Sequence, residues 1–269
     1  MTRLDIVAAG YDAVYAGLAS SATLRRIWHE HALGDEYPEG FEHLSFVSAA
    51  ELRSILKALR IPSGGLLIDV ACGTGGPGLW LARESAARLV GIDASRVAVA
   101  QARARAKQLD VSHGATFMVG RFDRLPLQSA AADAVVSIDA LQYAPNKMDA
   151  FAEIARVLRP NGRLLFTAFE VHAERAARLP IIGLDPVGDF RPVVEQNGFT
   201  IVGYDETAGW QDRVTSTYEA IRRDQNRLVS EMGAVAATAL AFEVSAMLDQ
   251  QIFQRRVRMI AERSARSDD

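Results

Sequence analysis

Short apolar runs alternate with amphipathic segments through the middle of this 269-residue chain. The apolar runs lie near residues 66–70, 88–92, 115–119, 134–138 and 163–169. Segments with apolar residues three or four apart lie near 77–84, 94–108 and 147–158, and a further helix and strand follow near 186–196 and 199–204. Such alternation is typical of βαβ units, in which a helix connects two parallel strands. The pattern predicts an α/β fold with a mainly parallel sheet flanked by helices.

Both ends of the chain have a helical pattern instead. At the amino-terminal end, helical spacing covers residues 4–18, 22–32 and 49–59. Beyond Trp210 there is no proline, and apolar residues recur three or four apart as far as Ile260. This spacing predicts two long amphipathic helices with a break at Gly233. No strand is evident after Tyr204, unless one is hidden in residues 207–214.

These patterns divide the chain into three parts. They are an amino-terminal helical lid at 1–60, an α/β core at 61–206 and a carboxyl-terminal helical extension at 207–269. The apolar stripe of the extension has to be buried against another surface. We expect it to pack on the core, and the alternatives are a homodimer contact or a cap over a substrate.

Composition and charge narrow the classes of partner. The chain has 30 basic and 33 acidic residues and a formal charge of -3, which gives no general attraction to nucleic acids or anionic membranes. A single cysteine, Cys72, excludes an internal disulfide, and no apolar run approaches the roughly 20 residues needed to cross a bilayer. The first residues lack the long apolar core of a signal peptide, and the histidines lack metal-ligand spacing. We therefore expect a cytoplasmic protein that binds neither nucleic acid, membrane nor metal.

Residues 66–78, LLIDVACGTGGPG, predict a buried strand that runs into a glycine-rich turn and then a helix. This segment resembles motif I of the class I, Rossmann-like S-adenosylmethionine-dependent methyltransferases, with Ala71 in place of the first glycine. Gly73 and Gly75 let the backbone approach a ligand because no Cβ intervenes. The resemblance implies that the backbone around Ala71, Cys72 and Gly73 faces the methionine part of the cofactor. It also implies that Asp69 fixes the loop and the ammonium group.

The same string also contains Gly73-x-Gly75-x-x-Gly78, the dinucleotide-binding fingerprint. A nicotinamide oxidoreductase is therefore an alternative. Three features favour a methyltransferase: an acidic residue already lies at the end of the first strand, no second mononucleotide-binding half follows, and later segments match the methyltransferase pattern in order.

Asp93 ends the second predicted strand, 20 residues past Gly73, and Ala94 follows it. A carboxylate at this point can accept hydrogen bonds from both ribose hydroxyls of a nucleoside ligand. The alternative role for Asp93 is to cap the next helix, which Ser95 could do instead.

Residues 120–127, GRFDRLPL, resemble the stretch that follows strand three in this family. Arg121 stands where the family has the acid that contacts adenine. Gly120, the backbone of Arg121 and Phe122, and the Phe122 ring as an apolar wall could still hold the base. The alternative is an exposed Arg121 beside a core Phe122.

Residues 132–143 resemble motif IV, and residues 151–166 are similar to the helix-turn-strand signature of the family. The resemblance implies that the chain leaves strand four beside the transferred methyl group. The candidate residues there are Ser137, Ile138 and Gln142.

Methyl transfer from a sulfonium is an in-line displacement, which needs a general base only if the acceptor atom is protonated. His172 follows the fifth strand and is the best-placed base on topology, although a solvated loop histidine fits the same position. His43 and Asp139 are second choices, of which Asp139 could equally cap the turn at strand four, and Tyr143 is a further candidate. Tyr11 and Tyr15 belong to the amino-terminal lid, where aromatic faces can stabilise a sulfonium or simply pack between helices.

The resemblance as a whole implies an enzyme that transfers a methyl group from S-adenosylmethionine to an O, N or C atom of a small-molecule acceptor, leaving S-adenosylhomocysteine. The helical ends and the lack of a basic face resemble methyltransferases of bacterial secondary metabolism. The alternative is a methyltransferase-like fold that binds the cofactor but acts as a non-methylating accessory or cyclising protein.

Overall fold

Seven strands form one sheet in the computed structural model, which describes residues 3–38, 40–177, 179 and 182–265. The strands are β1 (Leu66–Val70), β2 (Arg88–Asp93), β3 (Ala115–Val119), β4 (Ala132–Ile138), β5 (Leu158–Val171), β6 (Phe199–Glu206) and β7 (Phe253–Arg263). Their order is β3-β2-β1-β4-β5-β7-β6, and neighbours are parallel except that β7 runs antiparallel to β5 and β6. The predicted α/β fold with a mainly parallel sheet is confirmed.

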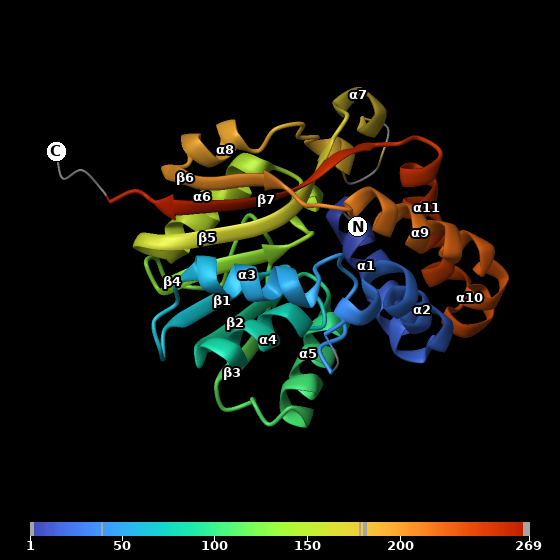
Figure 1. Ribbon diagram of the computed structural model, residues 1–269, viewed down its shortest axis with the longest axis horizontal. Coiled ribbons are helices and arrows are strands. Elements are labelled where there is room, and N and C mark those ends of the chain that lie inside the picture. The colour runs from blue at the N-terminus through green and yellow to red at the C-terminus, as the bar shows by residue number, and fades with distance from the viewer. Residues whose placement is uncertain (1–2, 39, 178, 180–181, 266–269) are drawn as a thin grey trace.

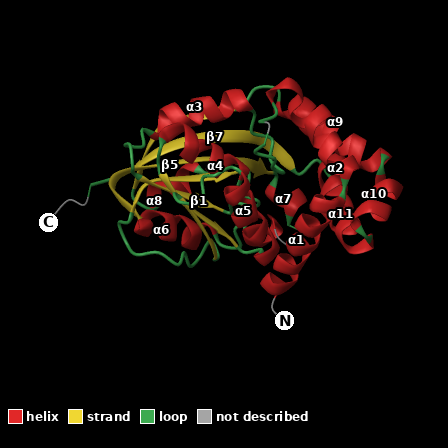
Figure 2. Cartoon of the chain, turned by 90° about the horizontal axis from the view of Figure 1, so that it is seen from below, coloured by secondary structure: helices red, strands yellow, loops and turns green. Residues whose placement is uncertain are grey.

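Helices cover both faces of the sheet (Figure 2). One face carries α3 (Ala49–Leu59), α4 (Gly76–Ser85) and α5 (Arg96–Gln108), and the other carries α6 (Lys147–Val157) and α8 (Arg191–Gln196). Successive side chains of a strand point to opposite faces. In β4, Val136 is therefore buried with residues of α3 to α5, and Val135 with residues of α6 and α8. Because both faces are covered, the parallel strands appear in the sequence as continuous apolar runs.

Helices from the two ends of the chain meet beyond one edge of the sheet (Figure 1). They are α1 (Arg3–Ser20), α2 (Ala22–Ile27), which continues as a π-helical turn (Trp28–Leu33), α9 (Trp210–Arg223), α10 (Gln225–Met232) and α11 (Ala234–Leu248). Apolar side chains of α2, α9 and α11 share one core with Phe169 and Val171 at the end of β5. These helices, which we call the helical cap, thus stand over the carboxyl ends of the parallel strands. Open α/β proteins bind their ligands at the carboxyl ends of the parallel strands.

The seventh strand corrects our interpretation of the carboxyl-terminal tail. Helix was expected as far as Ile260, but β7 occupies Phe253–Arg263 and enters the sheet between β5 and β6. Val257, Met259 and Ala261 alternate along it and are buried against the side of the sheet that carries α6 and α8. This period of two is typical of a strand. The helix prediction was wrong because Val257 and Ile260 also happen to lie three residues apart.

Other elements also depart from the expected pattern. Residues 207–214, the other place considered for a seventh strand, form a turn and the beginning of α9, which starts at Trp210. Helix α3, which we grouped with the amino-terminal lid, packs on the sheet beside α4. A short helix, α7 (Ala173–Ala176), and three 3-10 turns (Gly34–Glu36, Leu141–Tyr143 and Ile182–Leu184) connect the larger elements.

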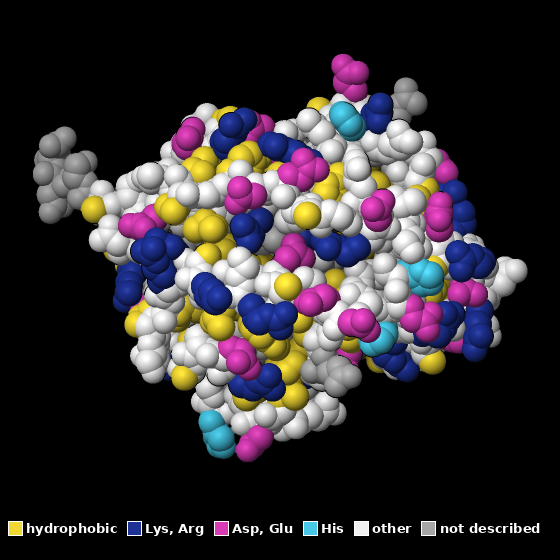
Figure 3. All heavy atoms as spheres, viewed as in Figure 1, with side chains coloured by type: hydrophobic (Ala, Val, Ile, Leu, Met, Phe, Trp, Pro, Cys, Tyr) yellow, Lys and Arg dark blue, Asp and Glu magenta, His cyan; other side chains and the backbone are white. Residues whose placement is uncertain are grey.

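The surface carries charges of both signs. On the face shown in Figure 3, basic and acidic side chains are interspersed over the sheet and the helical cap. Within the part of the chain that the structure describes, no helix combines the length and the apolar character that a membrane crossing requires.

Candidate functional site

The glycine-rich turn after β1 adopts a backbone that few residues can follow. Ala71, Gly73 and Gly75 have φ angles of 59°, 52° and 82°, in the left-handed region. The Gly75 N–H donates to the Cys72 carbonyl at 2.9 Å, which closes the turn, and the buried Cys72 N–H donates to the Ile92 carbonyl of β2 at 3.0 Å. Helix α4 follows at once, with proline in its first turn as predicted. The first N–H groups of this helix therefore face the carboxyl edge of the sheet.

Asp69 anchors this turn from below. Its side chain is 2% exposed and accepts a hydrogen bond from the Gly78 N–H in the first turn of α4. A Cβ on Gly78 would collide with the carboxylate, so this position requires glycine. Burial, and secondly the charge of Asp93, raises the pKa of Asp69 to about 8. The Asp69 side chain therefore joins the end of β1 to the first turn of α4.

Asp93 connects the turn after β1 to the start of α5. Its Oδ2 accepts the Gly73 N–H and its Oδ1 accepts the Ser95 N–H, each at 2.8 Å. Burial raises the pKa of Asp93, while the N–H groups of Ser95, Gly73 and Ala94 lower it. The side chain that caps α5 belongs to Ser95, whose hydroxyl accepts the Ala98 N–H. The side chain of Asp93 is therefore not needed to cap α5, and each of its carboxylate oxygens can accept a further hydrogen bond.

The loop after β3 lies directly beside Asp93. The Gly120 N–H donates to the Asp93 carbonyl at 3.0 Å, and a Cβ on Gly120 would lie 2.6 Å from a methyl carbon of Ile92. Arg121 is exposed and forms an ion pair with Asp123 at 2.5 Å. Phe122 is partly buried and packs against the core beneath the sheet. The Arg121 side chain is thus exposed, whereas the Phe122 ring packs inward.

Residues at the end of β4 are mainly occupied in holding the backbone. Ser137 is fully buried and donates to the Val70 carbonyl of β1 at 2.9 Å. Ile138 is buried beside it. Gln142 is buried and donates to the Asp139 carbonyl at 2.7 Å. These contacts fix the shape of the loop that carries Tyr143.

Asp139 is engaged in a buried ion pair. Its Oδ1 accepts from Arg256 Nε at 2.8 Å, and its Oδ2 accepts the Phe46 N–H at 2.8 Å. Arg256 is fully buried in β7 and also pairs with Glu51 of α3 at 2.7 Å. With both oxygens occupied, Asp139 is placed to hold β4, β7 and the segment before α3 together.

Two histidines lie near the same edge of the sheet. His172 is partly exposed at the start of α7, and no hydrogen bond among the described residues reaches its ring. His43 is buried, stacks on Tyr37 with ring centroids 6.0 Å apart, and receives the Ser45 N–H on Nδ1. Burial lowers the pKa of His43 to about 4, so this ring is neutral at physiological pH. No cluster of metal-binding side chains occurs in the described ranges.

Helix α1 covers the glycine-rich turn. A Cβ on Gly73 would lie 2.8 Å from the Tyr15 hydroxyl, so that the phenol rests directly on the turn. The Tyr15 carbonyl accepts from Gln101 of α5 at 2.9 Å. Asp12 accepts from the Ser95 hydroxyl and from the Val97 N–H at the start of α5. These contacts place Tyr15 over the glycine-rich turn, with Tyr11 beside it.

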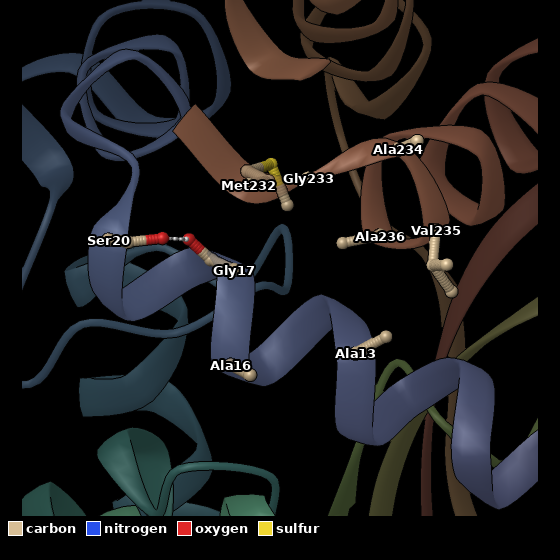
Figure 4. A pocket seen from close by; sticks show the side chains of 9 residues that line it. All are labelled: Ala13, Ala16, Gly17, Ser20, Met232, Gly233, Ala234, Val235 and Ala236. Atoms are coloured by element: carbon tan, nitrogen blue, oxygen red, sulfur yellow. Dashed lines mark hydrogen bonds between the residues drawn. The ribbon is translucent and has the colours of Figure 1, made fainter. Parts of the chain in front are cut away.

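The other side of α1 packs against α10 and α11 of the helical cap (Figure 4). A shallow groove runs between α1 and the junction of α10 and α11, lined by Ala13, Ala16, Gly17, Ser20 and residues 232–236. A Cβ on Gly17 would lie 2.9 Å from the Met232 Cβ, so glycine allows the helices to approach. Ser20 donates to the Gly17 and Glu231 carbonyls, each at 2.9 Å.

A cluster of phenols around Glu243 was not foreseen. Tyr143 and Tyr218 both donate to Glu243 Oε1, at 3.0 and 2.7 Å. The Tyr11 ring meets Tyr143 edge to face at 5.9 Å and stacks near Tyr15 at 6.3 Å. One signal was available in the sequence, because Glu243 is the only charged residue in the apolar helix α11. The structure thus brings Tyr11, Tyr15 and Tyr143 to one place and leaves His172 outside their hydrogen bonds.

Comparison with known proteins is consistent with this geometry. Residues 68–166 match the family described as Methyltransferase domain. The 24-methylenesterol C-methyltransferase 2 of Oryza sativa subsp. japonica is 34% identical over 112 residues, which are 42% of this chain and 30% of the relative. The 27-O-demethylrifamycin SV methyltransferase of Amycolatopsis mediterranei (strain S699) is 30% identical over 160 residues, 60% of this chain and 57% of the relative. The chain thus spans less than two thirds of either relative.

The likeness of fold extends over nearly the whole chain. The crystal structure of the cyclase SpnF superposes with a TM-score of 0.75 at 23% identity, and the match covers 96% of both chains. At this identity the likeness shows the fold alone.

Proposed function

We propose that this chain, whose residues 68–166 match the family described as Methyltransferase domain, is a class I, Rossmann-like methyltransferase that transfers a methyl group from S-adenosylmethionine to a small-molecule acceptor. The observation that carries this proposal is the carboxylate of Asp93, fixed by two N–H groups against Gly73 and beneath Tyr15. A second carboxylate, Asp69, lies under the same turn.

The residues present fit an adenosyl sulfonium. Gly73 has no Cβ, so the Tyr15 hydroxyl lies directly against the turn, and the backbone around Ala71 would face the methionine part. The free lone pairs of Asp93 would accept both ribose hydroxyls. Gly120 and Phe122 would bound the adenine ring. When bound, the cofactor supplies an activated methyl group, and the remaining task of the protein is orientation.

Orientation is what the helical cap can provide. Tyr11 and Tyr15 are held over the turn by contacts of α1 to α5 and to α10 and α11, and they exclude water from it. Correct positioning of the reacting groups lowers such barriers by about 7–11 kcal/mol. Aromatic faces above a sulfonium add about 0.5–2 kcal/mol of attraction.

The setting we propose is bacterial secondary metabolism in the cytoplasm. One of the relatives is named for the methylation of 27-O-demethylrifamycin SV, a small molecule. The charges on the surface are mixed in sign, and the net charge of -3 does not favour a nucleic acid as the acceptor.

Two measurements test the proposal. Calorimetry should detect binding of S-adenosylmethionine and S-adenosylhomocysteine and little binding of NAD. Incubation with S-adenosylmethionine and a panel of small hydroxyl, amine and carbon acceptors should release S-adenosylhomocysteine, detected by mass spectrometry. Firm cofactor binding without product from any acceptor would favour the non-methylating alternative. Binding of NAD in place of S-adenosylhomocysteine would refute the proposal.

A further inference from the structure

Glu243 is a single carboxylate in an otherwise uncharged helix. It lies on the side of α11 that faces the rest of the cap, where Oε1 accepts from Tyr143 and Tyr218. These two phenols come from different elements, the turn after β4 and helix α9. The carboxylate is therefore held in a defined place by two donors that are far apart in the sequence.

A continuous series of side chains leads from this carboxylate to the glycine-rich turn. The Tyr11 ring contacts Tyr143 and its hydroxyl forms a hydrogen bond with that residue. Tyr15 stacks near Tyr11, and its hydroxyl rests on Gly73. Burial and, after it, the charges of Glu243 and Asp93 raise the pKa of Tyr11, so this phenol lies near both carboxylates. Glu243 thus lies at the end of a packed series of phenols that begins at the proposed cofactor site.

The phenols of the cluster remain protonated. Burial is the main reason that the pKa values of Tyr11, Tyr143 and Tyr218 are raised well above 10.0, and the charge of Glu243 raises each further. Both hydroxyls that reach Glu243 donate to Oε1. Among the hydrogen bonds of the described residues, none ends on Oε2. This oxygen has the capacity to accept one more proton donor.

We propose that Glu243 is the general base of the methyl transfer and that the acceptor is a neutral molecule presenting a hydroxyl group. This inference rests on the proposed function. The acceptor hydroxyl donates to Glu243 Oε2, and Tyr143 and Tyr218 are positioning residues that hold Oε1.

The step balances in atoms and charge. As the acceptor O–H bond breaks, its proton passes to Glu243 Oε2, and the oxygen forms a bond to the methyl carbon. The bond from that carbon to sulfur breaks and its electron pair stays on sulfur. The products are a methyl ether, neutral S-adenosylhomocysteine and a protonated Glu243, which returns its proton to solvent. One negative and one positive charge are neutralised together, which suits surroundings of low polarity.

The surroundings favour a neutral acceptor with an apolar body. Tyr218 shares its core with Leu240, Val244 and Met247, apolar residues on the same helix as Glu243. A phosphate or carboxylate group on the acceptor would be repelled by Glu243. The nearby cation, Arg256, is already paired with two carboxylates.

Substitution of the carboxylate by its amide tests the base. Glu243→Gln keeps the size of the side chain and an oxygen for the phenols, but it cannot take a proton. A matched control is Glu219→Gln, the same change on the exposed side of α9, next to Tyr218. Each variant is assayed at saturating S-adenosylmethionine with phenol, aniline and carbon acceptors built on one apolar ring scaffold. Calorimetry with S-adenosylhomocysteine reports on cofactor binding separately.

The expected result is methylation of the hydroxyl acceptor and a kcat for Glu243→Gln that is about 100- to 10,000-fold lower at pH 7. Affinity for S-adenosylhomocysteine should remain within twofold of the wild-type value, and Glu219→Gln should retain full activity. The residual rate of Glu243→Gln should rise roughly tenfold per pH unit, since the acceptor then ionises by itself.

A readout independent of turnover follows from the titratable groups that face Glu243. These are Tyr11 and Tyr15 of α1, Tyr143 and Tyr218, with Asp93 and Asp139 beyond the phenols. Removing the charge should lower the pKa of the buried phenols. In an ultraviolet titration the tyrosines of Glu243→Gln should therefore ionise at lower pH than those of the control.

Two results would overturn the inference while the proposed function stands. One is a kcat for Glu243→Gln within threefold of the wild-type value, and the other is a wild-type enzyme that methylates the amine or carbon acceptors but not the hydroxyl. Failure of the wild-type protein to bind S-adenosylhomocysteine would instead refute the proposed function itself.

Discussion

Replacing Asp93 by asparagine is the most direct perturbation of the proposed cofactor site. Both carboxylate oxygens accept a backbone N–H at 2.8 Å, and each retains capacity for a ribose hydroxyl. Asparagine offers one oxygen and one NH2 group, so it cannot serve two N–H donors and two hydroxyls at once. The loss of one charge-assisted hydrogen bond costs about 1.5–3 kcal/mol. The Kd for S-adenosylhomocysteine should therefore rise about 10- to 150-fold.

Calorimetry of Asp93→Asn with S-adenosylhomocysteine provides the measurement. A matched control is Asp110→Asn, an exposed position in the turn after α5 with a φ of 55°, which asparagine tolerates. Because Asp93 also joins Gly73 to the start of α5, thermal unfolding must show that the variant is folded at the temperature of the assay. A Kd within twofold of the wild-type value in a folded variant would refute our placement of the ribose.

Three further predictions concern stability. Burial raises the pKa of Asp69 to about 8, above the 3.8 of an unperturbed aspartate. Between these two values the unfolded chain binds fewer protons than the folded protein, so the free energy of unfolding decreases as pH rises from 4 to 8. Asp69→Asn should flatten this decrease in urea denaturation at pH 5 and pH 8, and an unchanged slope would contradict the assignment. Gly17→Ala places a Cβ 2.9 Å from the Met232 Cβ and should lower the melting temperature. Gly10 lies in the same helix, and a Cβ there would have no heavy atom within 4 Å. Gly10→Ala should therefore raise the free energy of unfolding by about 0.5–1 kcal/mol through helix propensity, and the melting temperature with it. Equal effects of the two substitutions would show that α1 does not pack closely on α10. Arg256→Met leaves the buried carboxylate of Asp139 and the partly buried carboxylate of Glu51 without this partner and should cost about 3–5 kcal/mol in chemical denaturation, while a loss below about 1 kcal/mol would show that the ion pair is not important for stability.

Local sequence determined the parallel part of the sheet. Strands β1 and β3 begin and end where the apolar runs do, and α4, α5 and α6 agree with their helical patterns to within two residues. The reason is that strands covered on both faces need continuous apolar runs, and the intervening helices need one apolar stripe. The turn from Asp69 to Gly78 could also be identified because its residues are consecutive in the chain.

The position of β7 could not be derived in the same way. Its partners β5 and β6 lie far earlier in the chain, and its sequence includes Arg256, a charge that is fully buried. Such a residue interrupts the apolar pattern of a strand, and its burial depends on Asp139 and Glu51, which no local pattern brings together. The alternation of Val257, Met259 and Ala261 was the one local signal.

For the site, the sequence by itself determined which backbone would form the glycine-rich turn and where the carboxylate of Asp93 would stand. Both follow from short-range geometry, because a strand that ends in a left-handed turn leaves few choices for its residues. Only the tertiary structure decided which side chains from distant segments join Tyr11 and Tyr15 above this turn. Tyr15, Tyr143 and Glu243 are separated by about 100 residues or more, and they meet because α1 and α11 bury their apolar sides against each other above the sheet. Burial of that kind is a property of whole surfaces, so no single segment specifies it.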